Sequence, residues 1–545
     1  MKPNQFVKFA SLTRTLLIIF LLTNVVIRLK AQPPTDFQNS INNLLSSYSD
    51  TSQPAISIAV VKNGIPIYSA ALGMANIEKR ASNDSNTQFW IASVTKQFTA
   101  AAIFKLVSQR KVSLQASVRT FIPELPEIFQ PVTLDHLIHH TGGIRDGFVL
   151  TALSKKPESE YTNENVIKYL KMQKRHNFTP GTRYEYNNSG YVLLATVIER
   201  VSGQLYADFL KNELFLPIGM KHTYVSASFP NNAMQAEGYH ATPSGFDGGH
   251  FRGNTYGSTG IITTLGDITR WVQFIQQPNS IPNLTAMGNQ LLRTGRLSNG
   301  KSIAYAGGLE KFTYSGLPVY EHFGSDEGFK ANTLYFPTKE VSIIGLTNNG
   351  SFYGLQALLY RIADIMLTRT NEQKADVDFG KADSVVYYYN TSVPQLLRLQ
   401  FHREGVKISN TPSGYAAPYL ISADTFFSID PLPARYLKKD RSLQVLDNCY
   451  HNTYVMTRID LLPPIKKFEK YIGEYTSNEL ATSYKITQGM SGLQFEFLPG
   501  VTFDLFQVNE TDFMFEYVGS NFIQFTEKGF LFSREGIRQL SFNKK

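Results

Sequence analysis

Apolar and polar positions alternate with different periods along the chain, and these periods predict the order of its elements. Apolar residues recur at helical spacing from Phe37 to Tyr48, and Thr35 can cap the helix that they predict. The stretch Ala55–Gly73 contains two strand-like runs around Asn63-Gly64, which is a strong hairpin signal. Helical spacing returns at 96–107, and residues from about 115 to 300 are typical of helices joined by long loops.

Short strands dominate the next part of the chain. The segments "AYAGGLEKFTY", "LPVYEHF", "ANTLYFP" and "EVSIIGLTNN" follow one another, and "GLQALLYRIADIML" then returns to helical spacing. A helix and hairpin at one end, strands and a helix at the other, and helices between them predict an α+β domain. We expect an antiparallel sheet that both ends of this domain complete and that helices flank, with a helical insertion.

The chain changes character after this domain. A polar, charged stretch, "RTNEQKADVDFGKADS", predicts a linker at 373–394 between a domain at 33–372 and a second domain at 395–545. Segments such as "LQFHREGVKIS", "GLQFEFLPG" and "FIQFTEKGFLFS" read as strands rich in aromatic residues. The second domain is therefore predicted to be all-β and barrel-like, with a minor break at Pro463-Pro464.

Composition and charge narrow the class of protein. With 545 residues, 42% hydrophobic and 18% charged, the chain is long enough for several globular domains with ample cores. The formal charge is +9, but the first 31 residues carry five basic residues and no acidic one, which leaves +4 for the rest. Without a basic run or a nucleic-acid motif, this excess does not predict a nucleic-acid partner.

The first 31 residues resemble an export signal. An apolar run, Leu16–Ile27, follows basic residues and is shorter than the roughly 20 residues that span a bilayer as a helix. We expect cleavage near Ala31 and a secreted or periplasmic protein. Arg28 and Lys30 follow the apolar run, so an uncleaved signal that anchors the chain in a membrane stays open as the alternative.

A serine and a lysine three positions apart form the first candidate for chemistry. In "WIASVTKQFTAAAIFKL", Ser93 and Lys96 stand where an apolar helix begins, and residues three apart share a helical face. Burial lowers the pKa of an ammonium, so the amine of Lys96 could take the proton of the Ser93 hydroxyl. The spacing alone is weak evidence: it recurs at Ser108, Ser298 and Ser541, and taken alone it favours a capping serine before a solvated lysine.

Two further motifs follow in order. Tyr186-Asn187-Asn188 precedes an apolar helix, and His322-Phe323-Gly324 lies in a predicted strand, followed by Ser325. Each motif recurs elsewhere in the chain, so each is also compatible with a structural role. The lone cysteine, Cys449, allows no intrachain disulfide and has little support as a nucleophile.

Together the three motifs resemble the serine β-lactamase and penicillin-binding protein superfamily. The segments "LIHHTGGI", "FLPIGMKHTYV" and "GSTGIITTLGDITRWVQF" are similar to recurrent phrases of one branch. That branch holds class C β-lactamases, D-alanyl-D-alanine carboxypeptidases, D-aminopeptidases and related esterases, and the resemblance covers about 35–370. It implies a β-lactamase-like fold and a serine hydrolase that needs no cofactor.

The resemblance also implies a role for each residue. Ser93 would attack an acyl carbonyl, Lys96 would take or hold its proton, and Tyr186 would assist proton transfer to the leaving group. Asn188 would hydrogen-bond the substrate, and the backbone N–H groups of Ser93 and Ser325 would form an oxyanion hole. His322 and Gly324 would line the substrate site.

His322 bears on the substrate. Many superfamily members carry a lysine at this position, whereas the ordinary pKa of histidine, about 6.5, leaves it mostly neutral at pH 7. We therefore expect an esterase or peptidase for small or peptide substrates that are less acidic than β-lactams. Adjacent His139 and His140 are expected to structure a loop rather than bind metal, and Asp326-Glu327 to form a solvated loop.

Two other classes of function stay open. One is a catalytically weak penicillin-binding protein or sensor of peptidoglycan peptides, which covalent labelling by an activated ester would separate from an enzyme. The other is an assembly module whose β domain does the main work. Neither the acyl group of the substrate nor the oligomeric state can be read from the sequence.

Overall fold

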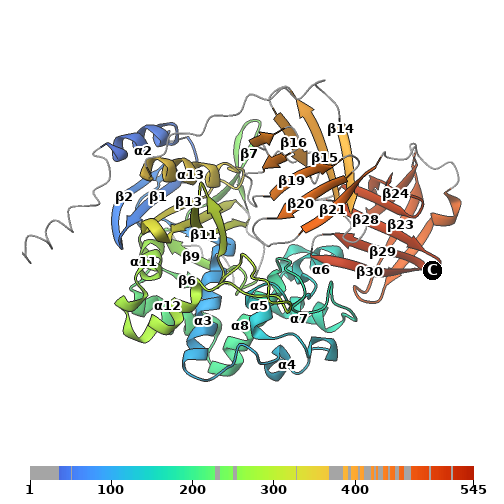
Figure 1. Cartoon of the computed structure of the whole chain (residues 1–545), viewed down its shortest axis with the longest axis horizontal. Coiled ribbons are helices and arrows are strands. Elements are labelled where there is room, and N and C mark those ends of the chain that lie inside the picture. The colour runs from blue at the N-terminus through green and yellow to red at the C-terminus, as the bar shows by residue number, and fades with distance from the viewer. Residues whose placement is uncertain are drawn as a thin grey trace, which may run out of the picture.

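The computed structural model places the chain in one α+β region and two large β-sheets (Figure 1). It describes residues 36–50, 52–226, 234–249, 254–326, 328–367, 385–390, 395–402, 405–409, 419–422, 425–427, 434–439, 442–447, 453–459, 468–489, 492–516, 520–534 and 536–545. The predicted signal at 1–31, Cys449 and Pro463-Pro464 lie outside these ranges. Among the described residues, no helix has the length and apolar character that a bilayer-crossing segment requires.

A six-stranded antiparallel sheet forms the centre of the α+β region, and both ends of that region contribute to it as predicted. The hairpin at Asn63-Gly64 is confirmed, with φ of 52° and 73° at its two turn residues. Strand pairing of Ile56 with Thr347 joins the first strand to the last. In spatial order the strands are β10 (Glu310–Tyr314), β11 (Leu317–Asp326), β12 (Phe329–Phe336), β13 (Val341–Thr347), β1 (Ile56–Lys62) and β2 (Ile65–Leu72).

Helices cover both faces of this sheet, which is why its central strands are buried on both sides. Helices α2 (Phe37–Leu45) and α13 (Leu355–Met366) pack on one face (Figure 1). Helix α11 (Leu265–Gln276) packs on the other, next to the helical insertion built around α3 (Lys96–Ser108) and α8 (Asn188–Ser202). The predicted α+β class is therefore confirmed.

The remaining elements of the α+β region are short. The helices are α4 (Val118–Phe121), α5 (Leu134–Ile138), α6 (Gly147–Leu153), α7 (Asn163–Lys171), α9 (Tyr206–Leu210), α10 (Leu216–Ile218) and α12 (Thr285–Leu291). The strands are β3 (Met74–Asn76), β4 (Ala81–Ser82), β5 (Gln88–Trp90), β6 (Tyr224–Val225), β7 (Gly238–Thr242), β8 (Gly245–Gly249) and β9 (Ile261–Thr264).

The C-terminal part contains two sheets where the sequence indicated one β domain. The first has eight strands, in the order β16-β15-β14-β21-β20-β19-β18-β17, and begins with β14 at Val385–Asn390, inside the range assigned to the linker. The others are β15 (Gln395–His402), β16 (Gly405–Ser409), β17 (Tyr419–Ser422), β18 (Thr425–Phe427), β19 (Ala434–Lys439), β20 (Ser442–Asp447) and β21 (Thr453–Ile459). The tyrosine-rich run of β14 pairs with β15 and β21, and this pairing outweighs the polar character of the residues around it.

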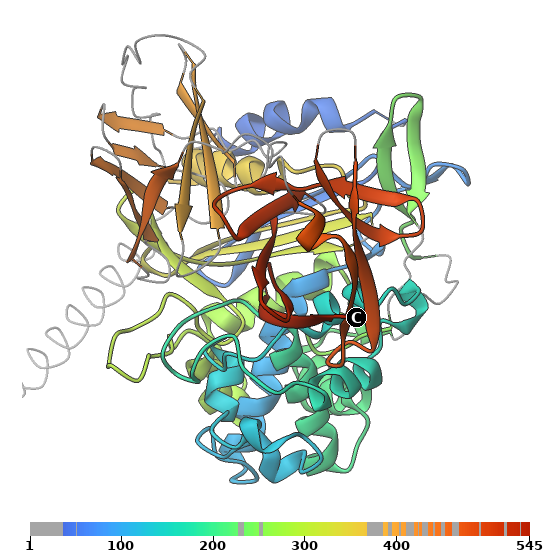
Figure 2. The same cartoon turned by 90° about the vertical axis from the view of Figure 1, so that its right-hand side faces the viewer.

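The second sheet is a nearly closed barrel, as predicted for this part of the chain (Figure 2). Its nine strands run in the order β25-β24-β23-β22-β30-β29-β28-β27-β26, and β25 and β27 lie side by side where the sheet curls back on itself. The ring of Tyr484 packs against the rings of Phe495 and Phe542, and all three are buried in the barrel. The strands are β22 (Gly473–Ser477), β23 (Thr482–Gln488), β24 (Leu493–Leu498), β25 (Val501–Asp504), β26 (Phe506–Gln507), β27 (Asp512–Glu516), β28 (Ser520–Thr526), β29 (Gly529–Arg534) and β30 (Ile537–Lys544).

A buried carboxyl group on the central sheet predicts how stability depends on pH. Glu321 accepts hydrogen bonds from Tyr360 at 2.7 Å and Gln356 at 2.5 Å, and burial raises its pKa to about 8. Because the folded state holds this proton more tightly than the unfolded state, stability should fall as pH rises from about 4.5 to about 8. Glu321→Gln should remove most of that fall, on the order of a few kcal/mol.

Thermal melting at pH 5 and pH 9, followed by tryptophan fluorescence, measures this effect. Both tryptophans of the chain, Trp90 and Trp271, are buried in the α+β region, so their fluorescence reports its unfolding. Glu164→Gln, at an exposed carboxylate, is the matched control. Equal loss of melting temperature between the two pH values in wild type and Glu321→Gln would contradict the prediction.

Candidate active site

Ser93 lies in a strained turn between strand β5 and helix α3. The turn is the 3-10 segment η2 (Ala92–Thr95), so Ser93 precedes the α-helix by one turn, where the sequence placed it at the helix start. Ala92 has φ of 45°, in the left-handed region that residues with a side chain avoid. Such strain is kept where the surrounding structure imposes it, often at functional sites.

Gly324 explains how strand β11 approaches this turn. A Cβ atom at Gly324 would lie 2.3 Å from the backbone oxygen of Ile91 and 3.2 Å from the backbone nitrogen of Ser93. Only glycine therefore allows the strand to pack directly against the turn that carries Ser93. This is a physical reason for the last residue of the His-x-Gly motif.

Lys96 is fully buried, and its amine has three polar neighbours. Its Nζ lies 3.0 Å from Ser93 Oγ, 2.9 Å from Asn188 Oδ1 and 2.9 Å from the backbone oxygen of Ser258. Burial lowers the pKa of Lys96 to about 7, while the charges of Asp146 and Asp326 oppose that shift. Near neutral pH a large fraction of Lys96 is therefore an uncharged amine.

These neighbours determine where the lone pair of the neutral amine points. Asn188 Oδ1 and the Ser258 carbonyl can only accept, so they take the two N–H bonds that a neutral amine possesses. The lone pair is then left for the hydroxyl of Ser93. In this protonation state Ser93 donates to Lys96, which is the arrangement that a general base requires.

Tyr186 reaches the same serine from the other side. Its hydroxyl donates to Ser93 Oγ at 3.1 Å, and the Lys96 amine lies 4.8 Å from the centre of its ring. Burial raises the pKa of Tyr186 well above 10, partly offset by its hydrogen bond to Ser93. Tyr186 is thus a neutral phenol that donates a proton rather than a phenolate that accepts one.

The backbone around Asn188 is held by Asp146. The Asn187 side chain caps α8 by accepting from Gly190 N at 3.0 Å, and Asp146 Oδ2 accepts from Asn188 N at 2.7 Å. The other oxygen of Asp146 accepts from the backbone of Phe148 and caps α6. Burial raises the pKa of Asp146, and backbone hydrogen bonds and the charge of Lys96 oppose that shift. Sequence reasoning missed Asp146, because an aspartate after an arginine in a loop carries no signal of this contact.

His322 is neutral and enclosed. The carbonyl of Phe323 accepts from its Nδ1 at 2.8 Å, which leaves Nε2 to accept from Tyr305 at 3.1 Å. Burial and the charge of Lys96 lower the pKa of His322 to about 3. The prediction that no permanent cation stands at this position agrees with these contacts, and both ring nitrogens already bond to protein atoms.

Lys330 places a cation beside Ser325, which sequence reasoning also missed. The two residues pair across β11 and β12, and Lys330 Nζ donates to Ser325 Oγ at 2.8 Å. Burial lowers the pKa of Lys330, and Asp326 opposes that shift. Asp326 itself ends β11 and accepts from Trp90 Nε1 at 3.2 Å, so it is fixed in place where a solvated loop was expected. Glu327, the other member of that predicted loop, lies outside the described residues.

His140 structures the loop before Tyr186. It has φ of 55°, and its Nδ1 accepts from Asn187 N at 3.1 Å, while burial lowers its pKa well below 6.5. Neighbouring His139 contacts Asp135 through Nδ1 at 3.1 Å. Within the described part of the chain, no group of three His, Cys, Asp or Glu side chains is arranged to hold a metal ion.

Comparison with known proteins identifies the class to which this fold and site belong. Residues 41–364 match the family described as Beta-lactamase, which is more than half of the chain. The chain belongs to this family, and the predicted resemblance to the serine β-lactamase and penicillin-binding protein superfamily is confirmed.

Two groups of relatives illustrate the match. The chain is 27% identical over 302 residues to the D-aminopeptidase of Gluconobacter oxydans (strain 621H), covering 55% of this chain and 56% of that protein. It is 28% identical over 299 residues to the D-aminopeptidase of Brucella canis (strain ATCC 23365 / NCTC 10854 / RM-666), covering 54% and 56%. The chain thus spans about half the length of these relatives.

Solved structures share the fold. The octameric penicillin-binding protein homologue from Pyrococcus abyssi has a TM-score of 0.55 at 22% identity and covers 77% of this chain and 99% of its own. The penicillin binding protein from Bacillus halodurans has a TM-score of 0.52 at 24% identity and covers 60% and 98%. At these identities the likeness bears on the fold alone.

Proposed function

We propose that the protein is an exported serine hydrolase that forms an acyl-enzyme at Ser93 and cleaves amide bonds, and ester bonds of similar shape. The observation that carries this proposal is the buried amine of Lys96, 3.0 Å from Ser93 Oγ and flanked by two obligate acceptors. The relatives named D-aminopeptidase support amides of D-amino acids as substrates. The resemblance found in the sequence adds small cell-wall peptides. Export rests on the composition of 1–31, with a secreted or periplasmic location.

In acylation, Ser93 Oγ attacks the acyl carbon of the substrate while its proton passes to the neutral amine of Lys96. The new C–O bond converts the carbonyl into an oxyanion, which the backbone N–H groups of Ser93 and Ser325 stabilise. In other enzymes one such donor contributes about 3 kcal/mol. Tyr186 then protonates the leaving nitrogen or oxygen, takes a replacement proton from Lys96, and the bond to the leaving group breaks.

In deacylation, water attacks the same acyl carbon and its proton returns through Tyr186 and Lys96. Ser93 leaves with a proton, so the enzyme is regenerated and one water is consumed for each bond cleaved. Asn188 accepts from Lys96 through Oδ1, so its Nδ2 is the atom that would donate to a substrate oxygen. Because His322 is neutral, substrates that need a cation at that position, as many β-lactams do, should react poorly.

A substrate panel tests this proposal. The purified full chain should release D-alanine from D-alanine amide and p-nitrophenol from p-nitrophenyl acetate, and hydrolyse nitrocefin at least tenfold more slowly. Ser93→Ala should lose turnover of all three. Absence of both turnover and covalent labelling by an activated ester would favour a sensor of peptidoglycan peptides, and full activity in Ser93→Ala would contradict the site assignment.

A further inference from the structure

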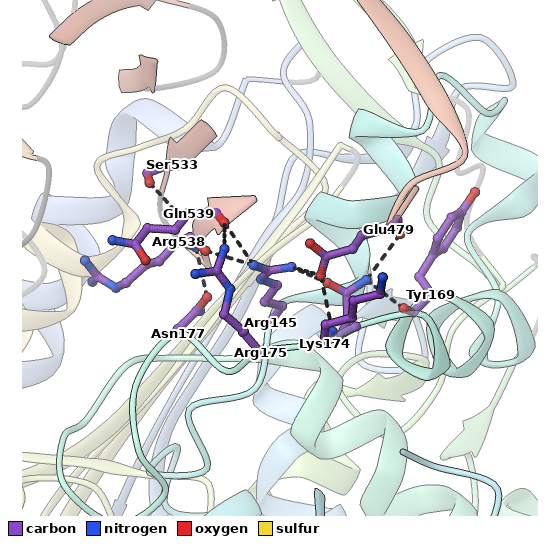
Figure 3. Close-up of polar contacts among 10 residues, drawn as sticks. Arg145, Tyr169, Lys174, Arg175, Asn177, Glu479, Ser533, Arg538 and Gln539 are labelled. Carbon is purple, nitrogen blue, oxygen red and sulfur yellow. Dashed lines mark hydrogen bonds and ion pairs between the residues drawn. The ribbon is translucent and has the colours of Figure 1, made fainter. Parts of the chain in front are cut away.

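The C-terminal barrel contacts the two loops that shape the candidate site. Figure 3 shows the side chains that meet where the β29–β30 hairpin and Glu479, in the loop after β22, lie against the α+β region. Asp146 N, which belongs to the residue that holds the backbone of Asn188, donates to the carbonyl of Gly536 at 2.9 Å. The barrel therefore contacts the loop that contains Asp146, which holds the backbone of Asn188 beside Lys96.

A buried ion pair anchors the first loop. Arg145 Nη1 lies 2.7 Å from Glu479 Oε2, with exposed side-chain fractions of 0% and 8%. The same guanidinium donates to the backbone oxygens of Arg538 and Gln539 (Figure 3). It also donates to Gln173 Oε1 at 2.6 Å. Removing one member of such a pair leaves an uncompensated buried charge, so loss of either Arg145 or Glu479 should disrupt the contact between the loop and the barrel.

A second ion pair anchors the loop that carries the tyrosine. Arg538 of β30 pairs with Glu185, with exposed fractions of 18% and 12%, and its Nε donates to Glu185 Oε2 at 2.9 Å. Asn177 joins the same group, since it donates to Glu185 Oε1 at 2.7 Å and accepts from Arg538 N at 2.9 Å. Glu185 directly precedes Tyr186, so this contact fixes the backbone one residue from the phenol that bonds to Ser93.

We infer that the barrel is a positioning element of the active site, in which Arg538 and Glu185 hold the Tyr186 segment at hydrogen-bonding distance from Ser93. The inference rests on the proposed function, because it concerns the proton that Tyr186 delivers. Proton delivery depends on the leaving group. An amine must be protonated before it departs, whereas p-nitrophenolate departs without a proton.

We expect substitution of Arg538 to lower activity by an amount that depends on the leaving group of the substrate. Arg538→Gln in the full chain should lower kcat/KM for D-alanine amide by about 10- to 100-fold, since misplacing a reacting group by about 1 Å can cost 10²-fold. For p-nitrophenyl acetate the loss should stay below about threefold. The double variant Arg538→Glu with Glu185→Arg restores an ion pair of opposite direction and should recover part of the amide activity.

The matched control is a surface ion pair on the helical insertion of the α+β region. Arg200 pairs with Glu124 on the surface, with exposed fractions of 39% and 34%. Arg200→Gln removes the same charge without touching the Tyr186 segment, and both activities should stay at the wild-type level. The melting temperature of each variant, followed by tryptophan fluorescence, separates unfolding from misplacement.

Two outcomes would overturn the positioning role of the barrel, and one would support it. Unchanged amide activity in Arg538→Gln, or equal losses on both substrates, would overturn the positioning role. A selective amide loss that the charge-reversed double variant recovers would support it. Absence of Ser93-dependent turnover in the wild type would instead contradict the proposed function, and this inference with it, before any variant is compared.

Discussion

Lys96→Met is expected to lower kcat/KM for both amide and ester substrates by about 10³-fold or more. The variant keeps the volume of the buried side chain and removes the group that takes the proton of Ser93. General-base catalysis alone contributes about 10² to 10⁴ in rate, and removal of the amine also unpairs Asn188 Oδ1 and the Ser258 carbonyl. Both acylation and deacylation should therefore slow.

The activity of the wild type should depend on pH through the protonation state of Lys96. Burial lowers the pKa of Lys96 to about 7, so kcat/KM should rise with pH through that region as the amine loses its proton. The rise should be absent from the residual activity of Lys96→Met. Lys105→Met, on the same helix but bonded to the backbone of Asn283, is the matched control and should keep the wild-type rate. A wild-type profile that is flat between pH 5 and pH 9 would contradict the role of Lys96.

Tyr186→Phe is expected to lower kcat for amide substrates by about 10²- to 10³-fold. The phenylalanine ring preserves the packing against His140, but the proton donor that lies 3.1 Å from Ser93 Oγ is lost. Esters of p-nitrophenol should lose much less in acylation, because that leaving group departs without a proton.

Tyr314→Phe is the matched control for this substitution. Tyr314 bonds to Asp364 on the opposite side of the central sheet, so both activities should be unchanged there. Stopped-flow measurement of the acylation burst separates the two steps of turnover. Equal losses of burst rate on amide and ester in Tyr186→Phe would contradict a role in leaving-group protonation.

The sequence predicts the motif residues of this site better than it predicts the residues that hold them in place. Ser93 and Lys96 are three residues apart, and the 3-10 turn that leads into α3 brings their side chains together. The order of the three motifs indicates the remaining members. Asp146 and Lys330 carry no local signal. Their places depend on strand register and on a loop that folds against α8.

The contacts between the C-terminal barrel and the α+β region could not be predicted from the sequence either. Arg145 and Glu479 are separated by 334 positions, and nothing in either segment indicates that a barrel loop meets a loop of the α+β region. The aromatic-rich segments at 492–500 and 522–533 were correctly predicted to contain strands. Their pattern could not show that the C-terminal strands form two sheets, because strand periodicity does not encode which strands pair.

The most direct test of the account is to identify the atom that carries the acyl group. The full chain is mixed with a slowly deacylating activated ester at pH 6 and at pH 8, and each reaction is quenched in acid. The protein is then digested, and the acylated residue is located by mass spectrometry. A single acyl group is expected on Ser93, formed faster at pH 8 than at pH 6, and absent from Ser93→Ala. Acylation of another residue, or acylation of Ser93 at the same rate in Lys96→Met, would contradict the proposed roles of Ser93 and Lys96.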